Sequence, residues 1–110
     1  MSTNNFNTQI RKGLIEFCVL QIISRGKVYT TDIIEELHKS KIIVVEGTLY
    51  PLLNRLKSSN YVEYLWQETS QGPPRKYYTL TKEGSDHLKD LNVSWVELDK
   101  AVNKIIKTKK

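Results

Sequence analysis

The amino-acid sequence predicts a mainly α-helical chain with a small β-hairpin and a long C-terminal helix. Leucines at 49, 52, 53 and 56 have the i, i+3, i+4, i+7 spacing of one helix stripe. Directly after this helix, residues 62–67 alternate with period two, and residues 75–80 return as a tyrosine-rich strand. From 88 to 105, apolar residues recur every three or four positions, as in a helix that packs against another helix.

The segment 48–80 has the layout of a winged helix-turn-helix. The helix face opposite the leucines carries groups that hydrogen-bond or stack, namely Thr48, Tyr50, Pro51, Asn54, Arg55 and Ser58. In the hairpin, residues 71–74 (Gln-Gly-Pro-Pro) predict a rigid turn that places Arg75 and Lys76 at the tip. Such a helix enters the major groove of DNA, and such a wing contacts the backbone or minor groove. The expected DNA-binding residues are Thr48, Tyr50, Pro51, Asn54, Arg55, Lys57, Arg75 and Lys76.

Length and charge limit the class of protein. The 110 residues suffice for one small domain, and a chain with 39% hydrophobic and 26% charged residues is an ordinary globular protein. The net charge is +5, and residues 48–82 hold five positive and two negative charges, a net of +3. A basic balance favours a polyanionic partner, and double-stranded DNA fits the layout of this segment.

Other functional classes lack sequence support. With Cys18 as the single cysteine there is no internal disulfide, and His38 and His87 have no partners at metal-ligand spacing. The sequence has no Gly-rich phosphate loop and no nucleophile beside a base, so we expect no enzyme, cofactor or metal.

The polar N-terminus lacks a signal-peptide core and no apolar run is long enough for a membrane span, so we expect a cytoplasmic location. Cys18 is expected to be a small buried hydrophobe.

Two helices are predicted before the four-leucine helix. After a loose polar arm over residues 1–5, a helix runs from about 6 to 24, with apolar residues on most of its circumference. A second helix runs from 32 to about 39 and is capped by Thr30 or Thr31.

The four-leucine helix is expected to begin with Thr48 as its N-cap. Pro51 would then lie in the first turn, where its missing N–H does no harm. A start at Glu46 would require an irregularity at Pro51. Residues 40–45 before it are expected to form a loop that inserts apolar side chains into the core.

Thr81 is expected to cap a fourth helix that runs to about Lys107. Its apolar residues form a narrow heptad seam, which favours packing against another helix over lying on a broad core. We therefore expect a homodimer, with residues 1–80 as the DNA-binding region and 81–110 as the dimerisation helix of one compact domain. The expected dimerisation residues are Leu14, Leu88, Leu91, Leu98, Val102 and Ile105, with Trp95 in the middle of the seam.

Three motifs resemble the PadR-like transcriptional regulators: GTLYPLLNRL at 47–56, GPPRKYY at 72–78 and LTKEG at 80–84. The resemblance covers nearly the whole chain and implies a dimeric DNA-binding regulator, often a repressor. It implies that Tyr50 and the basic wing contact DNA, and that the C-terminal helix pairs with the partner's first helix. One departure concerns the second helix, which in many members starts with Gly-Tyr and here has Thr30-Thr31.

The resemblance also implies a ligand site at Trp95. In some short members an aromatic residue on the last helix stacks on flat ligands in a pore at the dimer interface. The stretch Ser94-Trp95 followed by Leu98-Asp99 is similar to that segment, which implies a small aromatic effector. The alternative is that Trp95 only fills the dimer core.

Two other binding functions remain open. A winged-helix module that binds protein without specific DNA binding would have the same fold, with Arg75 and Lys76 only protecting a hairpin edge from aggregation. RNA binding is less favoured, because no aromatic platform for single strands is evident. A steep salt dependence of DNA binding would distinguish the protein-binding module from a DNA-binding regulator.

Overall fold

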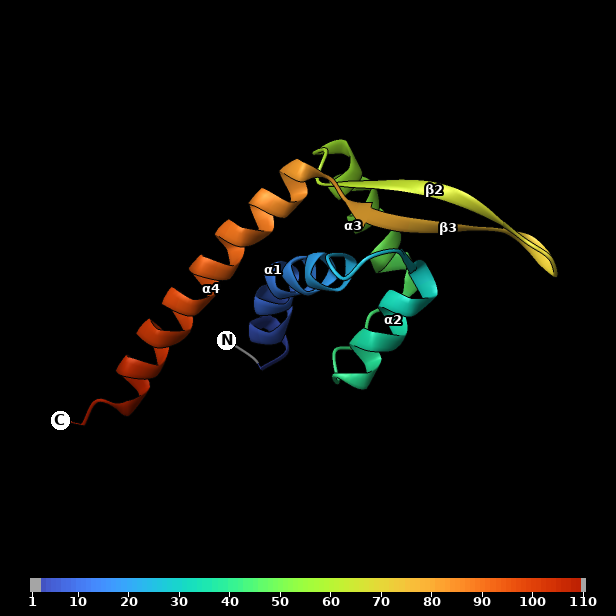
Figure 1. Ribbon diagram of the computed structural model, residues 1–110. Helices are drawn as coiled ribbons and strands as arrows, with labels where there is room; N and C mark the ends of the chain where they lie inside the picture. The colour runs from blue at the N-terminus through green and yellow to red at the C-terminus, as the bar shows by residue number, and fades with distance from the viewer. Residues whose placement is uncertain (1–2, 110) are drawn as a thin grey trace.

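The computed structural model describes residues 3–109, which form four helices and a three-stranded antiparallel sheet (Figure 1). The elements in chain order are α1 (Thr3–Ile23), β1 (Val28–Tyr29), α2 (Thr30–Lys39), α3 (Glu46–Ser58), β2 (Val62–Thr69), β3 (Gly72–Leu80) and α4 (Lys82–Lys107). The predicted fold class, mainly α with a small hairpin and a long C-terminal helix, is confirmed. Helix α1 starts at Thr3, so most of the predicted polar arm is helical; residues 1–2 lie outside the described part.

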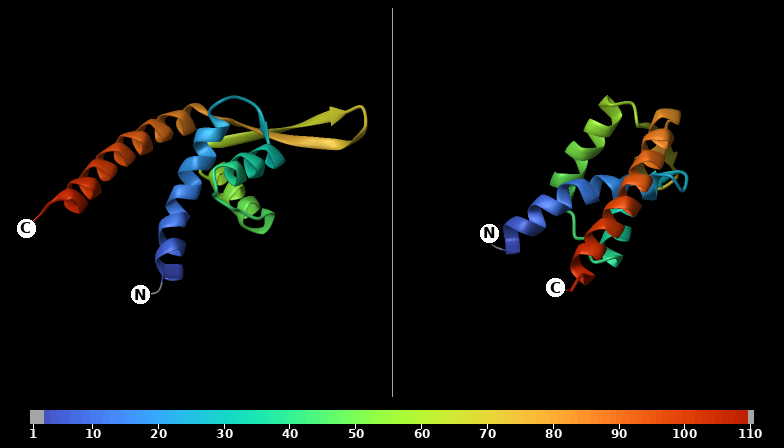
Figure 2. Two further views of the ribbon diagram at one scale, coloured as in Figure 1. Left: turned by 90° about the horizontal axis from the view of Figure 1, so that it is seen from below. Right: turned by 90° about the vertical axis from the view of Figure 1, so that its left-hand side faces the viewer.

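The molecule is elongated, with principal extents of 64 × 31 × 22 Å. Helices α1, α2 and α3 gather at the base of the hairpin, which projects away from them on one side, while α4 projects on the other (Figures 1 and 2). The hairpin and α4 are therefore free to contact other molecules along most of their length.

The core lies among the first three helices and the hairpin base. The predicted leucine stripe of α3 is fully confirmed, because Leu49, Leu52, Leu53 and Leu56 are each at most 5% exposed. Burial stabilises the fold by about 1.5–3 kcal/mol for each such side chain. Other core residues, drawn from every element but β1, include Val19, Leu20, Ile23, Ile33, Leu37, Val62, Tyr78 and Leu88.

The connector before α3 is a loop, as predicted, but only part of it enters the core. Val44 is buried and Ile42 is half-buried, whereas Ile43 and Val45 are 62% and 64% exposed. Successive side chains of an extended segment point to opposite sides, so a run of four apolar residues cannot all face inward.

The predicted threonine cap of α2 is wrong. Tyr29 precedes the helix, its backbone N–H donates to the Asp32 carboxylate at 3.0 Å, and Thr30 is buried in the first turn. The cause is β1, which pairs Val28 and Tyr29 with β3 and keeps the chain extended up to the helix. A two-residue strand has no periodicity that a sequence could show.

Helices α2 and α3 end in the same way. Lys41 and Asn60 adopt left-handed backbone conformations with φ of 69° and 64°. The next N–H in each case donates back into the helix, from Ile42 to the Leu37 carbonyl at 2.8 Å and from Tyr61 to the Leu56 carbonyl at 3.0 Å. These are Schellman motifs. Asparagine is common at the left-handed position and lysine is not, so the sequence indicates the motif at Asn60 but not the one at Lys41.

Helix α3 begins three residues before the predicted start, with Val45 and not Thr48 as its N-cap. The N–H groups of Thr48 and Leu49 both donate to the Val45 carbonyl, at 3.0 and 3.1 Å, so the first turn already includes Glu46. Pro51 therefore lies inside the helix, not in its first turn. Pro51 has no N–H to donate to the Gly47 carbonyl. Gly47 is exposed, so water can hydrogen-bond to that carbonyl instead.

The hairpin turn also differs from the prediction. The turn consists of Ser70 and Gln71, because Gly72 already pairs with Thr69. Arg75 and Lys76 lie opposite Gln67 and Trp66 along the strands, so their predicted place at the tip is wrong.

Pro73 and Pro74 explain the shift. Between the Thr69–Gly72 and Gln67–Arg75 pairs, these two prolines face the single residue Glu68, which makes an irregularity of the bulge type. Proline has a φ that suits an extended strand, and a bulge tolerates its missing N–H. The prolines therefore lengthen the strand instead of forming the turn.

Helix α4 follows its prediction closely. The Gly84 N–H donates to Thr81 Oγ1 at 2.9 Å, which confirms the cap, and the helix runs from Lys82 to Lys107. Leu88 is buried and Leu91 packs against the core, but beyond them the helix leaves the rest of the chain (Figure 2).

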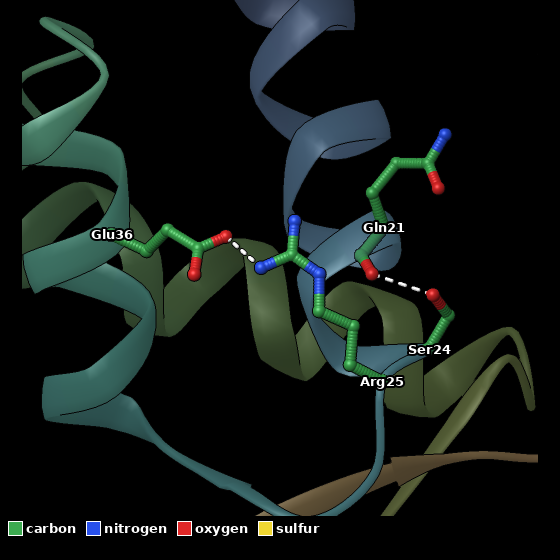
Figure 3. A network of polar contacts seen from close by, with 4 residues as sticks. All are labelled: Gln21, Ser24, Arg25 and Glu36. Carbon is green, nitrogen blue, oxygen red and sulfur yellow. Dashed lines mark hydrogen bonds and ion pairs between the residues drawn. The ribbon is translucent and has the colours of Figure 1, made fainter.

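A polar network joins the end of α1 to α2 at the surface (Figure 3). The Arg25 guanidinium pairs with the Glu36 carboxylate, and the Ser24 hydroxyl donates to the Gln21 carbonyl at 2.6 Å. An exposed ion pair of this kind contributes at most about 1 kcal/mol.

Between residues 3 and 109, no helix is both long enough and apolar enough to cross a membrane.

Candidate nucleic-acid interface

The predicted DNA-contacting face of α3 is exposed along its whole length. The exposed residues are Thr48, Tyr50, Pro51, Asn54, Arg55 and Lys57. At 100° per residue, Asn54 points away from the buried leucines. Tyr50 and Lys57 fall on one flank of this face, and Thr48 and Arg55 fall on the other.

The flank with Lys57 joins the wing. The Lys57 ammonium lies 5.2 Å from the centre of the Tyr64 ring of β2, and the Lys76 ammonium of β3 lies 3.9 Å from the same ring. The negative face of an aromatic ring attracts cations, so Tyr64 holds one cation from α3 near one from the wing. This contact makes the basic surface continuous from α3 to β3.

Arg75 lies at a second junction, between the wing and the start of α2. Its guanidinium carbon is 3.9 Å from the centre of the Tyr29 ring, and its Nη2 donates to Thr31 Oγ1 at 3.0 Å. The structure therefore places both predicted wing cations against aromatic rings of the sheet, along the strands and not at the tip.

The other flank of α3 faces α1 across a groove of about 580 Å³. Arg55 lines this groove together with Arg11 and Lys12 of α1, and Arg11 also donates to the Ile43 carbonyl. Arg11 and Lys12 were not predicted as neighbours of α3. They lie more than thirty positions earlier in the chain, so no local pattern could indicate the contact.

The expected dimerisation residues divide into two groups. Leu88 and Leu91 pack within the chain's own core and Leu14 is half-buried, whereas Leu98, Val102 and Ile105 are 61%, 52% and 76% exposed. The exposed part of the seam therefore lies in the half of α4 that stands apart from the other helices (Figure 2).

Trp95 lies where α4 departs from α1. Its ring is 6.3 Å from the Phe17 ring at an angle of 43°, and the residue is 43% exposed. Nearby, the Gln21 side chain donates to Asn92 Oδ1 at 2.6 Å, which fixes α4 against α1. One side of the indole is thus packed and the other is accessible.

The groups gathered here are cations, hydroxyls, amides and aromatic rings, which suit binding to a polyanion. In the described range 3–109, no three His, Cys, Asp or Glu side chains converge on one point. Cys18, expected to be buried, is only half-buried and packs against the edge of the core. Its partial burial raises the pKa of the thiol, which keeps it protonated at neutral pH.

Comparison with known proteins agrees with this geometry. A model of the transcriptional regulator PadR-like family matches residues 19–90, from α1 into α4. The chain belongs to the PadR-like family. The motif resemblance is thereby confirmed, and DNA-binding regulation of transcription is the role of the family. The homologues are transcriptional regulators and not enzymes.

Solved structures of PadR-like regulators have the same fold. A PadR-like transcription factor from Bacteroides fragilis is 48% identical with a TM-score of 0.79, over 92% of this chain and 98% of that one. A PadR-like regulator from Bacillus cereus is 35% identical with a TM-score of 0.83, over 92% and 99%. A PadR family regulator from Eggerthella lenta is 29% identical with a TM-score of 0.84, over 96% and 93%.

Proposed function

We propose that the protein is a cytoplasmic homodimeric repressor that binds a specific double-stranded DNA sequence. The observation that carries this proposal is the exposed polar face of α3, continuous through Tyr64 with the cations of the wing. Members of the PadR-like family regulate transcription by binding DNA. This surface carries the cations and hydrogen-bonding side chains that DNA binding requires.

The residues of this surface divide by chemistry. Asn54 points away from the core, and an asparagine amide can hydrogen-bond the edge of adenine in the major groove. Arg55 and Tyr50 on its two flanks are placed to contact bases or the adjoining backbone. Lys57, Arg75 and Lys76 carry the positive charge that binds phosphates and gives affinity without sequence preference.

Dimerisation is supported by the exposed apolar seam of α4. Leu98, Val102 and Ile105 would stay in water unless a second helix covered them, and Leu14 of the partner's α1 is a suitable contact. A two-fold dimer presents two copies of α3, so the operator should be pseudo-palindromic with half-sites about one helical turn apart.

Release by an effector is the finer part of the proposal. The accessible side of Trp95 offers a flat apolar surface next to the seam, suited to a small aromatic molecule. Such a molecule would release DNA only if it bound more tightly to a dimer whose α3 helices no longer match the half-site spacing.

Selection of bound sequences from random duplexes tests the proposed function. The purified chain should enrich a pseudo-palindromic motif, and its affinity for that motif should fall steeply as salt rises. If no motif is enriched and every duplex binds equally weakly, the chain is instead a winged-helix module for protein partners.

A further inference from the structure

Tyr29 occupies a fixed position at the meeting point of α2 and the sheet. Its hydroxyl donates to Gln67 Oε1 of β2 at 3.0 Å, and its ring meets the Tyr77 ring of β3 edge-on at 6.1 Å and 89°. Its backbone N–H donates to Asp32 in the first turn of α2. Contacts to three elements leave the ring little freedom to rotate.

The Arg75 side chain lies on this fixed ring. With the guanidinium carbon 3.9 Å from the ring centre, the group is held by attraction between the cation and the ring. A guanidinium has five N–H donors in its plane, and Thr31 Oγ1 accepts one of them. The side chain is exposed, so further in-plane donors remain available to a bidentate anion such as phosphate.

We infer that Tyr29 and Thr31 are positioning residues that hold Arg75 in place for one DNA phosphate beside the start of α2. The inference depends on the proposed DNA-binding function and adds residues outside α3 and the wing to it. An arginine held before binding loses less side-chain freedom when the phosphate arrives, so part of the ordering cost is avoided.

The charge around α2 assigns the role to Arg75 and not to the helix start. Asp32 lies in the first turn of α2 and its carboxylate takes up the Tyr29 N–H. A carboxylate there opposes an incoming anion, so the N–H groups of α2 are a poor phosphate site by themselves. The Thr31 hydroxyl accepts a hydrogen bond from Arg75 and so holds the guanidinium beside the start of α2.

A double-mutant cycle tests the inference on the full-length protein. Tyr29→Leu removes the ring, while Tyr29→Phe keeps the ring and loses only the hydroxyl contact to Gln67. Each is made with Arg75 present and with Arg75→Ala, and affinity for the selected duplex is measured by fluorescence anisotropy over a series of salt concentrations. Thr31→Val, which removes only the acceptor, provides an independent variant should Tyr29→Leu fail to fold.

With Arg75 present, Tyr29→Leu should weaken binding roughly 2- to 10-fold and Thr31→Val about 2-fold. Tyr29→Phe should stay near wild type. In the Arg75→Ala background none of the three should change affinity further, and Tyr29→Leu should lower the salt slope toward that of Arg75→Ala.

Equal losses in both backgrounds would show that Tyr29 and Thr31 act only on the fold, which would overturn the inference. No loss in either background would overturn it as well. Failure of the proposed function is distinguishable, because the wild-type protein would then enrich no motif and would bind every duplex equally weakly.

Discussion

At the scale of single residues, Asn54 and Lys76 represent the two kinds of DNA contact. Asn54→Ala should cost about 1–3 kcal/mol on the selected site and little on random duplex, because a base contact is lost. Lys76→Ala should weaken binding to both duplexes alike and flatten the salt dependence, because only a phosphate contact is lost. Titration of each variant with matched specific and random duplexes measures both effects.

Lys100→Ala is the control for charge. It removes one positive charge at an exposed position on the outer side of α4, away from the seam and the wing. If Lys100→Ala weakens binding as much as Lys76→Ala, net charge and not position decides affinity. If Asn54→Ala affects specific and random DNA equally, the division between base and phosphate contacts is wrong.

Trp95 is the residue on which the effector proposal depends. In a Trp66→Phe variant, Trp95 is the only tryptophan, so fluorescence reports on this position alone. Titration with planar aromatic compounds, neutral and cationic, should quench the signal saturably and weaken operator binding in parallel.

The opposite outcome is equally clear. A blue-shifted emission, protected from iodide and unchanged by a broad panel of compounds, would mean that a dimer covers the accessible side of Trp95. Trp95 would then be packed on both sides, against Phe17 of its own chain and against the partner subunit.

At the scale of elements, Gly84 joins the start of α4 to the base of the hairpin. A Cβ added at Gly84 would lie 1.8 Å from the Tyr61 carbonyl oxygen, which is backbone and also accepts the Thr81 N–H at 3.1 Å. Gly84→Ala should therefore destabilise the fold by about 1–3 kcal/mol or more, because the backbone must move.

Gly13→Ala is the matched control for this change. Gly13 is an exposed residue of α1 with nothing within 4 Å of an added Cβ, so alanine there should be neutral or stabilise by about 0.5–1 kcal/mol. Urea denaturation of both variants gives the two free energies. If the two variants have equal free energies of unfolding, α4 can move away from the Tyr61 carbonyl without loss of stability.

The seam of α4 is the second feature at this scale. Leu98→Asp should abolish dimers, because it buries a charge among Val102, Ile105 and the partner's apolar residues. Lys100→Asp introduces the same residue on the outer side of the helix and should leave the dimer intact. Sedimentation at matched concentrations compares the two, and a stable Leu98→Asp dimer would place the interface elsewhere.

At the scale of the whole molecule, the sequence was informative wherever a pattern repeats. The leucine stripe of α3, the cap at Thr81 and the extent of α4 all came from periodicity or capping chemistry, and the structure bears them out. The errors concern features without a repeat. The strand β1 has two residues, and the start of α3 depends on how the preceding connector packs.

The candidate site was predictable only in its local part. The exposed face of α3 follows directly from its leucines. The placement of Arg75 does not, because it depends on Tyr29 and Thr31, which lie more than forty positions earlier. Dipeptide preferences assigned the prolines to the turn, but the pairing of the two strands moved the turn to Ser70 and Gln71.

The single residue between the hairpin and α4 has a mechanical consequence. Thr81 is held by its N–H to the Tyr61 carbonyl, by its hydroxyl to the Asn60 carbonyl at 2.6 Å, and by the Gly84 N–H. Because these hydrogen bonds restrain Thr81, α4 and the wing should move together as one rigid unit, with α4 acting as a lever. With 26 residues α4 is about 39 Å long, so a rotation of about 10° at Thr81 moves its far end by about 7 Å. In a dimer joined through α4, the crossing angle of the two levers therefore sets the distance between the wings.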